Sequence, residues 1–159
     1  MIRKLSCILT LFLCAQVLMA QKAEMVSLDK LQDIIQSKEQ PLQIINFWAT
    51  WCAPCVKEIP FLEKINRERK DLRVILVSMD IDLDPNPEKV YKFIARKNIQ
   101  SRVVILNERD PNSWINKIDK SWSGSLPATL VVNNITGKRK FVDRELHEGD
   151  LEKWIDELK

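Results

Sequence analysis

The chain has 159 residues, of which 45% are hydrophobic and 30% are charged, with a formal net charge of +3 at pH 7. This length accommodates one compact domain whose core needs neither metal ions nor several disulfides for its stability. The near balance of acidic and basic residues provides no electrostatic basis for binding nucleic acid, so we expect no nucleic-acid partner.

The first twenty residues differ in character from the rest of the chain. Two basic residues precede an apolar run over residues 5–19, which is the arrangement of a secretory signal peptide. The run is shorter than the ~20 apolar residues that span a bilayer, and polar residues interrupt it. We therefore predict a cleaved signal peptide over residues 1–20 and a mature periplasmic domain over residues 21–159, with retention as a membrane anchor as the alternative.

Alternating helices and strands are predicted for the mature region. Helical spacing of apolar residues covers 27–35, 52–67, 87–97 and 150–159, and a short helix fits 110–119. Continuous apolar runs predict buried strands over 42–48, 72–79 and 103–106, and a β-hairpin fits 126–132 with 140–142. This order predicts an α/β fold with a central mixed β-sheet flanked by helices on both faces.

Two cysteines, Cys52 and Cys55, remain once the predicted signal peptide is removed. They form a C-x-x-C pair at the point where a predicted buried strand leads into a helix. The start of that helix offers free backbone N–H groups and the positive end of the helix dipole, which favour the thiolate of Cys52 over its thiol. Two intervening residues bring the Cys55 sulfur within reach, so the pair predicts a reducible disulfide rather than a structural disulfide framework.

Thiol–disulfide exchange is the chemistry that such a pair performs. We expect Cys52 to attack a disulfide of a protein substrate and Cys55 to resolve the mixed disulfide that forms. Pro54 stiffens the geometry of the dithiol because its ring fixes the backbone. A metal-binding module is the alternative, but a structural zinc site needs four ligands and the mature chain offers two cysteines and one histidine. Only Cu(I) held by two thiolates fits that count, and we assign no metal and no cofactor.

The stretch NFWATWCAPCVKEIPFLEKI over residues 46–65 resembles the thioredoxin superfamily and, within it, the TlpA/ResA-like thiol:disulfide oxidoreductases. The sequence SLPAT over residues 125–129 fits the same scheme, so the resemblance covers essentially the whole mature region. It implies a thioredoxin-like fold and a reductase of protein disulfides that receives electrons from an upstream membrane thiol:disulfide donor. Cytochrome c maturation and envelope redox homeostasis are both compatible settings, and we expect a monomer.

Glu58 lies one helical turn after Cys55 and matches the acidic residue of the family pattern. We expect it to shuttle the Cys55 proton with a pKa raised by partial burial, and a solvated glutamate at the start of a helix is the alternative. The resemblance adds weight to the first role. Asn46 occupies the position of the buried aspartate of ordinary thioredoxins, and an amide has no carboxylate to act as a base.

The residues around the cysteines are expected to set the redox direction and the docking of substrates. Strong oxidants of this fold tend to carry histidine where Ala53 stands, so Ala53 favours a reductant over a disulfide-forming oxidant. Trp51, together with Ala53 and Pro54, is expected to form part of the docking surface. The resemblance also implies a cis peptide bond between Leu126 and Pro127 beside the cysteines, which leaves the Leu126 backbone free to pair with an extended substrate segment.

Three further tryptophans and the single histidine are interpreted as structural residues. Trp48 is assigned to the core. Trp114 and Trp122 are expected to pack internally, and contact with a partner is the alternative. His147 has no acid–base companion nearby in the sequence and is expected at the surface.

Overall fold

The computed structural model describes residues 23–159, so the predicted signal peptide lies outside the described residues. Within this range the strands are β1 (Glu24–Val26), β2 (Leu42–Trp48), β3 (Leu72–Ser78), β4 (Arg102–Leu106), β5 (Ala128–Asn133) and β6 (Arg139–Val142). The helices are α1 (Leu28–Gln36), α2 (Ala53–Glu68), α3 (Glu88–Lys97), α4 (Ile115–Ile118) and α5 (Asp150–Leu158), with the 3-10 turns η1 (Asp80–Asp82) and η2 (Pro111–Ser113). None of the helices in this range is long and apolar enough to cross a bilayer.

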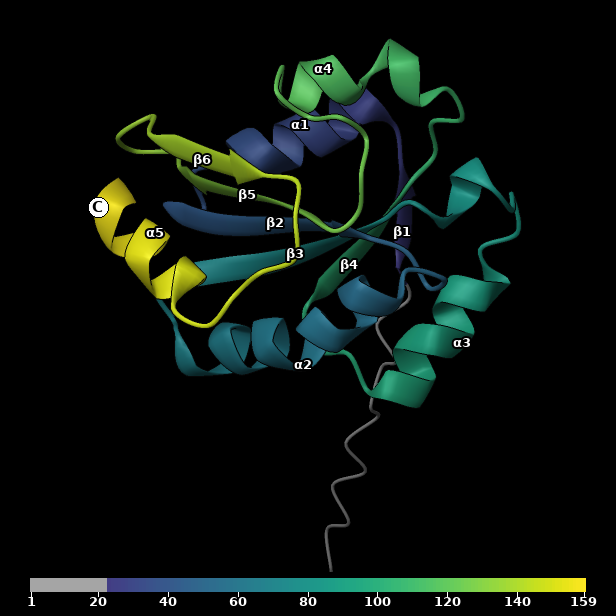
Figure 1. Ribbon diagram of the computed structural model, residues 1–159, viewed down its shortest axis with the longest axis horizontal. Helices are drawn as coiled ribbons and strands as arrows, with labels where there is room; N and C mark the ends of the chain where they lie inside the picture. Colours follow the sequence, from purple (N-terminus) through teal and green to yellow (C-terminus); the bar gives the residue numbers. More distant parts are fainter. Residues whose placement is uncertain (1–22) are drawn as a thin grey trace, which may run out of the picture.

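The strands form one mixed sheet of six strands in the order β1-β4-β3-β2-β5-β6 (Figure 1). The strands β1, β4, β3 and β2 are parallel to one another, and β5 runs antiparallel to both β2 and β6. All seven residues of β2 are buried, which explains why its sequence is largely apolar instead of alternating. The predicted mixed sheet is therefore confirmed.

Helices cover both faces of the sheet, as predicted. The helices α2, α3 and α5 pack on one face, and α1 and α4 pack on the other (Figure 1). Successive side chains of β2 alternate between the two cores: Ile44 and Trp48 face the first, and Ile45 and Phe47 face the second. Trp48 is fully buried, with its ring centroid 5.2 Å from that of Phe93 on α3, which confirms its assignment to the core.

Two local features differ from the sequence prediction. The strand β1 has no counterpart in that prediction, because a strand of three residues with two of them exposed is too short to show a period. The helix expected over residues 110–119 is divided into η2 and α4. The division falls at Trp114, whose backbone angles (φ −137°, ψ −21°) are not helical.

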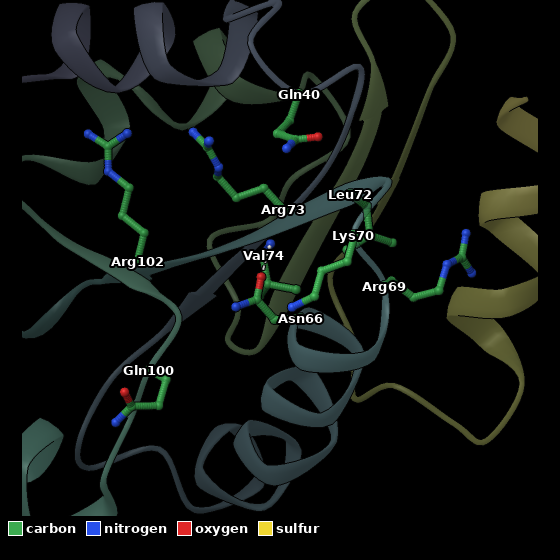
Figure 2. A pocket seen from close by; sticks show the side chains of 9 residues that line it. All are labelled: Gln40, Asn66, Arg69, Lys70, Leu72, Arg73, Val74, Gln100 and Arg102. Carbon is green, nitrogen blue, oxygen red and sulfur yellow. Dashed lines mark hydrogen bonds between the residues drawn. The ribbon is translucent and has the colours of Figure 1, made fainter.

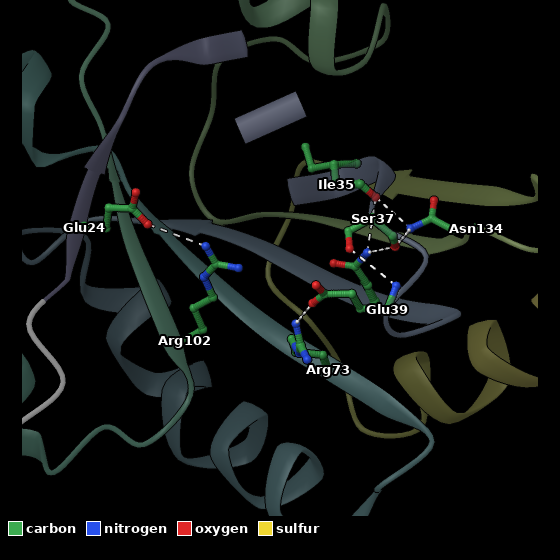
Figure 3. Close-up of polar contacts among 8 residues, drawn as sticks. Glu24, Ile35, Ser37, Glu39, Arg73, Arg102 and Asn134 are labelled. Carbon is green, nitrogen blue, oxygen red and sulfur yellow. Dashed lines mark hydrogen bonds and ion pairs between the residues drawn. The ribbon is translucent and has the colours of Figure 1, made fainter. Parts of the chain in front are cut away.

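The amino ends of β3 and β4 lie together at one end of the sheet because the two strands are parallel. They border a hollow of about 400 Å³ lined mainly by basic and amide side chains, in which Arg73 and Arg102 extend away from α2 (Figure 2). Arg73 lies 3.4 Å from a carboxylate oxygen of Glu39, and Arg102 lies 3.6 Å from one of Glu24 (Figure 3). Because both carboxylates are exposed to solvent, these ion pairs contribute little to stability.

The loop between β5 and β6 is tied to the end of α1. The side-chain amide of Asn134 donates hydrogen bonds of 2.8 Å to the backbone carbonyls of both Ile35 and Ser37 (Figure 3). The last carbonyls of a helix have no partner within the helix. Asn134 supplies a donor for these carbonyls, and it thereby links the end of α1 to the antiparallel part of the sheet.

Candidate active site

The carboxyl end of β2 leads directly into the two cysteines. Cys52 and Cys55 are joined by a disulfide, with their Cα atoms 5.3 Å apart. Cys52 is the N-cap of α2, and its sulfur accepts a hydrogen bond of 3.3 Å from the Cys55 backbone N–H. Cys55 is fully buried, whereas Cys52 retains 5% exposure. Cys52 is therefore the more accessible of the two cysteines.

The segment just before Cys52 is held by a carboxylate from the end of the neighbouring strand. Asp80 follows β3 and is only 2% exposed. Its two oxygens accept the Thr50 backbone N–H at 3.2 and 3.0 Å, and Oδ1 also accepts the Thr50 hydroxyl. The Ser78 hydroxyl donates to Oδ2 at 2.9 Å. Asp80 therefore fixes the approach to the disulfide, a role that the sequence analysis missed.

Glu58 is buried one turn after Cys55, with 5% exposure, which is inconsistent with the alternative of a solvated glutamate. Its Oε2 accepts a hydrogen bond of 3.3 Å from Asn46 Nδ2, and its Oε1 accepts the backbone N–H of Leu146. Asn46 Nδ2 also donates to Thr129 Oγ1 at 3.0 Å. Burial raises the pKa of Glu58 above its ordinary value, although both hydrogen bonds act in the opposite direction. Within residues 23–159, the Glu58 carboxylate accepts hydrogen bonds from these two donors and makes none with Cys55.

The peptide bond between Leu126 and Pro127 is cis, which confirms the expectation from the resemblance. Pro127 immediately precedes β5, whose first residue, Ala128, pairs with Phe47 of β2. This register places Pro127 at the same end of the sheet as the disulfide. Leu126 is partly buried and packs against both hydrophobic cores.

A groove of about 270 Å³ is bordered by Trp51 and Leu126, the residues that directly precede Cys52 and Pro127. Trp51 is 50% exposed and directly precedes Cys52. The other lining residues come from the segment after β3, from η2 and α4, and from the loop before the cis peptide bond: Met79, Asp82, Pro111, Trp114, Ile115, Trp122, Gly124 and Ser125. Of the predicted docking residues, Trp51 and Leu126 line the groove. Ala53 and Pro54, on the first turn of α2, and Pro127, just before β5, lie outside this lining.

Asp82 is the one acidic residue among the described residues that line the groove. Its Oδ1 is buried and has no hydrogen-bond partner within residues 23–159. Burial, together with the negative charge of Asp80, raises the pKa of Asp82 to about 6. The sequence analysis gave no indication of this residue, because its position in an acidic segment is typical of a solvated loop.

Two of the three tryptophans that line the groove are packed internally. The ring centroid of Trp122 lies 4.6 Å from that of Phe47 and 5.5 Å from that of Trp114. The Trp122 indole N–H donates to the Ser125 carbonyl at 2.9 Å. Trp114 and Trp122 are 1% and 5% exposed, which confirms internal packing for both, and His147 is exposed as predicted.

Comparison with known proteins gives a consistent result. The family model for thioredoxin matches residues 22–96. A thioredoxin of Rickettsia prowazekii is 31% identical over 83 residues, which are 46% of this chain and 78% of that protein. The thiol-disulfide oxidoreductase ResA of Halalkalibacterium halodurans is 31% identical over 90 residues, which are 56% of this chain and 46% of that protein, so this chain spans about half of its length.

A solved structure has the same architecture. The thioredoxin-related protein from Neisseria meningitidis serogroup B superposes with a TM-score of 0.66 and 23% sequence identity. The superposition covers 78% of this chain and 89% of that chain. At this identity the likeness establishes the thioredoxin-like fold.

Proposed function

Because this chain belongs to the thioredoxin family, we propose that it is an exported thiol:disulfide oxidoreductase that reduces disulfides of protein substrates through Cys52 and Cys55. The observation that carries the proposal is the disulfide itself, in which one sulfur caps the N-terminus of α2 and the other lies buried one turn inside. A helix N-terminus stabilises a thiolate there, and a thiolate is the form that attacks a disulfide.

The cycle conserves atoms and electrons. The Cys52 thiolate attacks one sulfur of the substrate disulfide, forms a mixed disulfide and releases the other substrate sulfur as a thiolate. Cys55 then attacks the Cys52 sulfur, which releases the second substrate thiolate and closes the Cys52–Cys55 disulfide seen in the structure. The substrate gains two electrons, and an upstream membrane dithiol of the same exchange chemistry returns two electrons to the protein.

Glu58 is proposed to take the proton that the Cys55 thiol loses before it attacks. A base works best when its pKa lies near the working pH, and burial moves the pKa of Glu58 upward, in that direction. The donors of Asn46 and Leu146 hold the carboxylate in place while leaving it one helical turn from Cys55. Asn46 cannot accept a proton at neutral pH, so Glu58 is the acid–base group of this buried network.

The setting outside the cytoplasm is supported by the sequence of residues 1–20, which has the pattern of a signal peptide. We place the mature domain in the periplasm, where its substrates are misoxidised envelope proteins or the cysteines of apocytochromes awaiting haem. Ala53 supports the reductive direction because it adds no donor that would stabilise the Cys52 thiolate further.

The deciding experiment is an insulin reduction assay combined with a measurement of the reduction potential of the Cys52–Cys55 pair. We expect insulin reduction that Cys52→Ala abolishes, and a potential near or below ~−270 mV. A potential near ~−120 mV would instead identify a disulfide-forming oxidant. Stoichiometric Cu(I) binding without any reductase activity would identify a metal module.

A further inference from the structure

The groove bordered by Trp51 and Leu126 is lined mainly by apolar residues and, among the described residues, by one charged residue, Asp82. Trp51 and Leu126 border it on the side of the cysteines, and Trp114 and Ile115 line it on the side of α4. Asp82, from η1, is the acidic residue among the described lining residues. A substrate chain that pairs with the Leu126 backbone therefore passes an aromatic and aliphatic surface with one carboxylate set into it.

The carboxylate of Asp82 differs from its neighbour two residues earlier. Asp80 accepts hydrogen bonds from Thr50 and Ser78, whereas Asp82 Oδ1 is buried without a partner in the part of the chain that the structure describes. Because Oδ1 is closed to solvent, a ligand in the groove meets the Asp82 carboxylate chiefly as a negative charge rather than through a hydrogen bond to Oδ1. The groove therefore offers a carboxylate whose partial burial the fold does not compensate at Oδ1, and a cation in the groove would compensate its charge.

One class of amino-acid side chain complements both features of the groove. Lysine and arginine carry a flexible aliphatic stem that packs on apolar and aromatic surfaces, and a cationic head that donates to a carboxylate. An apolar side chain would cover Asp82 without compensating its charge, and an acidic side chain would be repelled by Asp82 and Asp80. The groove therefore discriminates among substrates by charge as well as by shape.

We propose that this groove binds a lysine or arginine side chain adjacent to the reactive cysteine of the substrate, with Asp82 as the residue that determines this specificity. The inference rests on the proposed reductase function and adds a substrate class to it. Substrates with a basic residue next to the disulfide are then reduced faster than those with a neutral or acidic residue at that position.

The test uses three synthetic peptides with one intrachain disulfide that differ at a single residue: lysine, glutamine or glutamate, placed on either side of the first cysteine. The second-order rate constant for reduction by the prereduced protein is measured by stopped-flow tryptophan fluorescence. At one of the two positions we expect the lysine peptide to react about tenfold faster than the glutamine peptide, and the glutamate peptide to react more slowly still.

Asp82→Asn should bring the ratio of lysine to glutamine rates close to one, and Asp84→Asn, on the exposed part of the same segment, should keep the wild-type ratio. Each ratio is taken within one variant, so a general loss of structure would slow all three peptides and leave the ratio unchanged. Equal rates for the three wild-type reactions, or a ratio that survives in Asp82→Asn, would overturn this inference alone. Failure of the wild-type protein to reduce any of the peptides or insulin would instead overturn the proposed function.

Discussion

The two ends of the central sheet differ in how far their charged side chains are exposed to solvent. At the amino end, Arg73 and Arg102 face solvent-exposed carboxylates, so water screens both pairs (Figure 3). At the carboxyl end, about 20 Å away along β2, Asp80 and Glu58 are buried and Asp82 is half-buried. Hydrogen bonds satisfy Asp80, whereas desolvation raises the pKa values of Glu58 and Asp82. Desolvated ionisable groups therefore gather where the disulfide lies, which is typical of functional sites.

Asp80→Ala is expected to destabilise the fold strongly. It removes the acceptor of the Thr50 N–H and hydroxyl and of the Ser78 hydroxyl. The unpaired donors should lower the free energy of unfolding by about 3 kcal/mol. Denaturant unfolding of the oxidised protein measures the loss, with Asp84→Ala as the control on the exposed part of the same segment. Equal losses in the two variants would contradict the anchoring role.

The same residue shows what sequence reasoning could and could not predict. The cysteines and Glu58 were accessible because they lie within one short motif whose spacing carries the chemistry, and the Leu126–Pro127 pair was accessible through the family resemblance. Asp80 and Asp82 were not, because their environment depends on how the ends of β2 and β3 lie side by side. A weak signal for Asp80 exists in its position at the end of a buried strand. Asp82 shares its groove with residues of η2 and α4, which come from later in the chain, so its surroundings could not be read from its own segment.

Glu58→Gln is expected to slow the resolution of the mixed disulfide by about 100-fold, because it removes the group that we propose as the acceptor of the Cys55 proton. In the wild type, the rate of this step should fall as the pH drops through the raised pKa of Glu58, since a protonated carboxyl cannot accept that proton. In the Glu58→Gln variant, the rate of resolution should not show this fall at low pH. Rapid-mixing measurements between pH 4 and 8 test both points.

Glu63→Gln provides the matched control for Glu58, because Glu63 lies on the same helix and accepts the backbone N–H groups of Gln100 and Ser101 instead. We expect this control to keep the wild-type pH profile. An unchanged profile in Glu58→Gln as well would show that the Cys55 proton leaves by another route.

Asp82→Asn should produce a smaller effect that appears in the pH dependence of stability. The folded protein binds the Asp82 proton more tightly (pKa about 6) than the unfolded chain does (3.8), so the contribution of this carboxyl to stability is full at low pH and is lost as the pH rises through about 6. The shift corresponds to about 3 kcal/mol for a fully buried group and to about 1 kcal/mol after allowance for partial exposure. The variant should therefore be more stable than the wild type at pH 8 and not at pH 4, as measured by denaturant unfolding with Asp84→Asn as the control.

Arg73→Gln at the opposite end is expected to have the smallest effect. Its partner Glu39 is 76% exposed, and the pair is separated by 3.4 Å, so the substitution should change the free energy of unfolding by no more than about 0.5 kcal/mol at physiological salt. Reductase activity should not change, because this end lies a whole strand length from the disulfide. A loss above about 1 kcal/mol, or a slower reduction of insulin, would show that the basic end is coupled to the site and would remove the contrast between the two ends of the sheet.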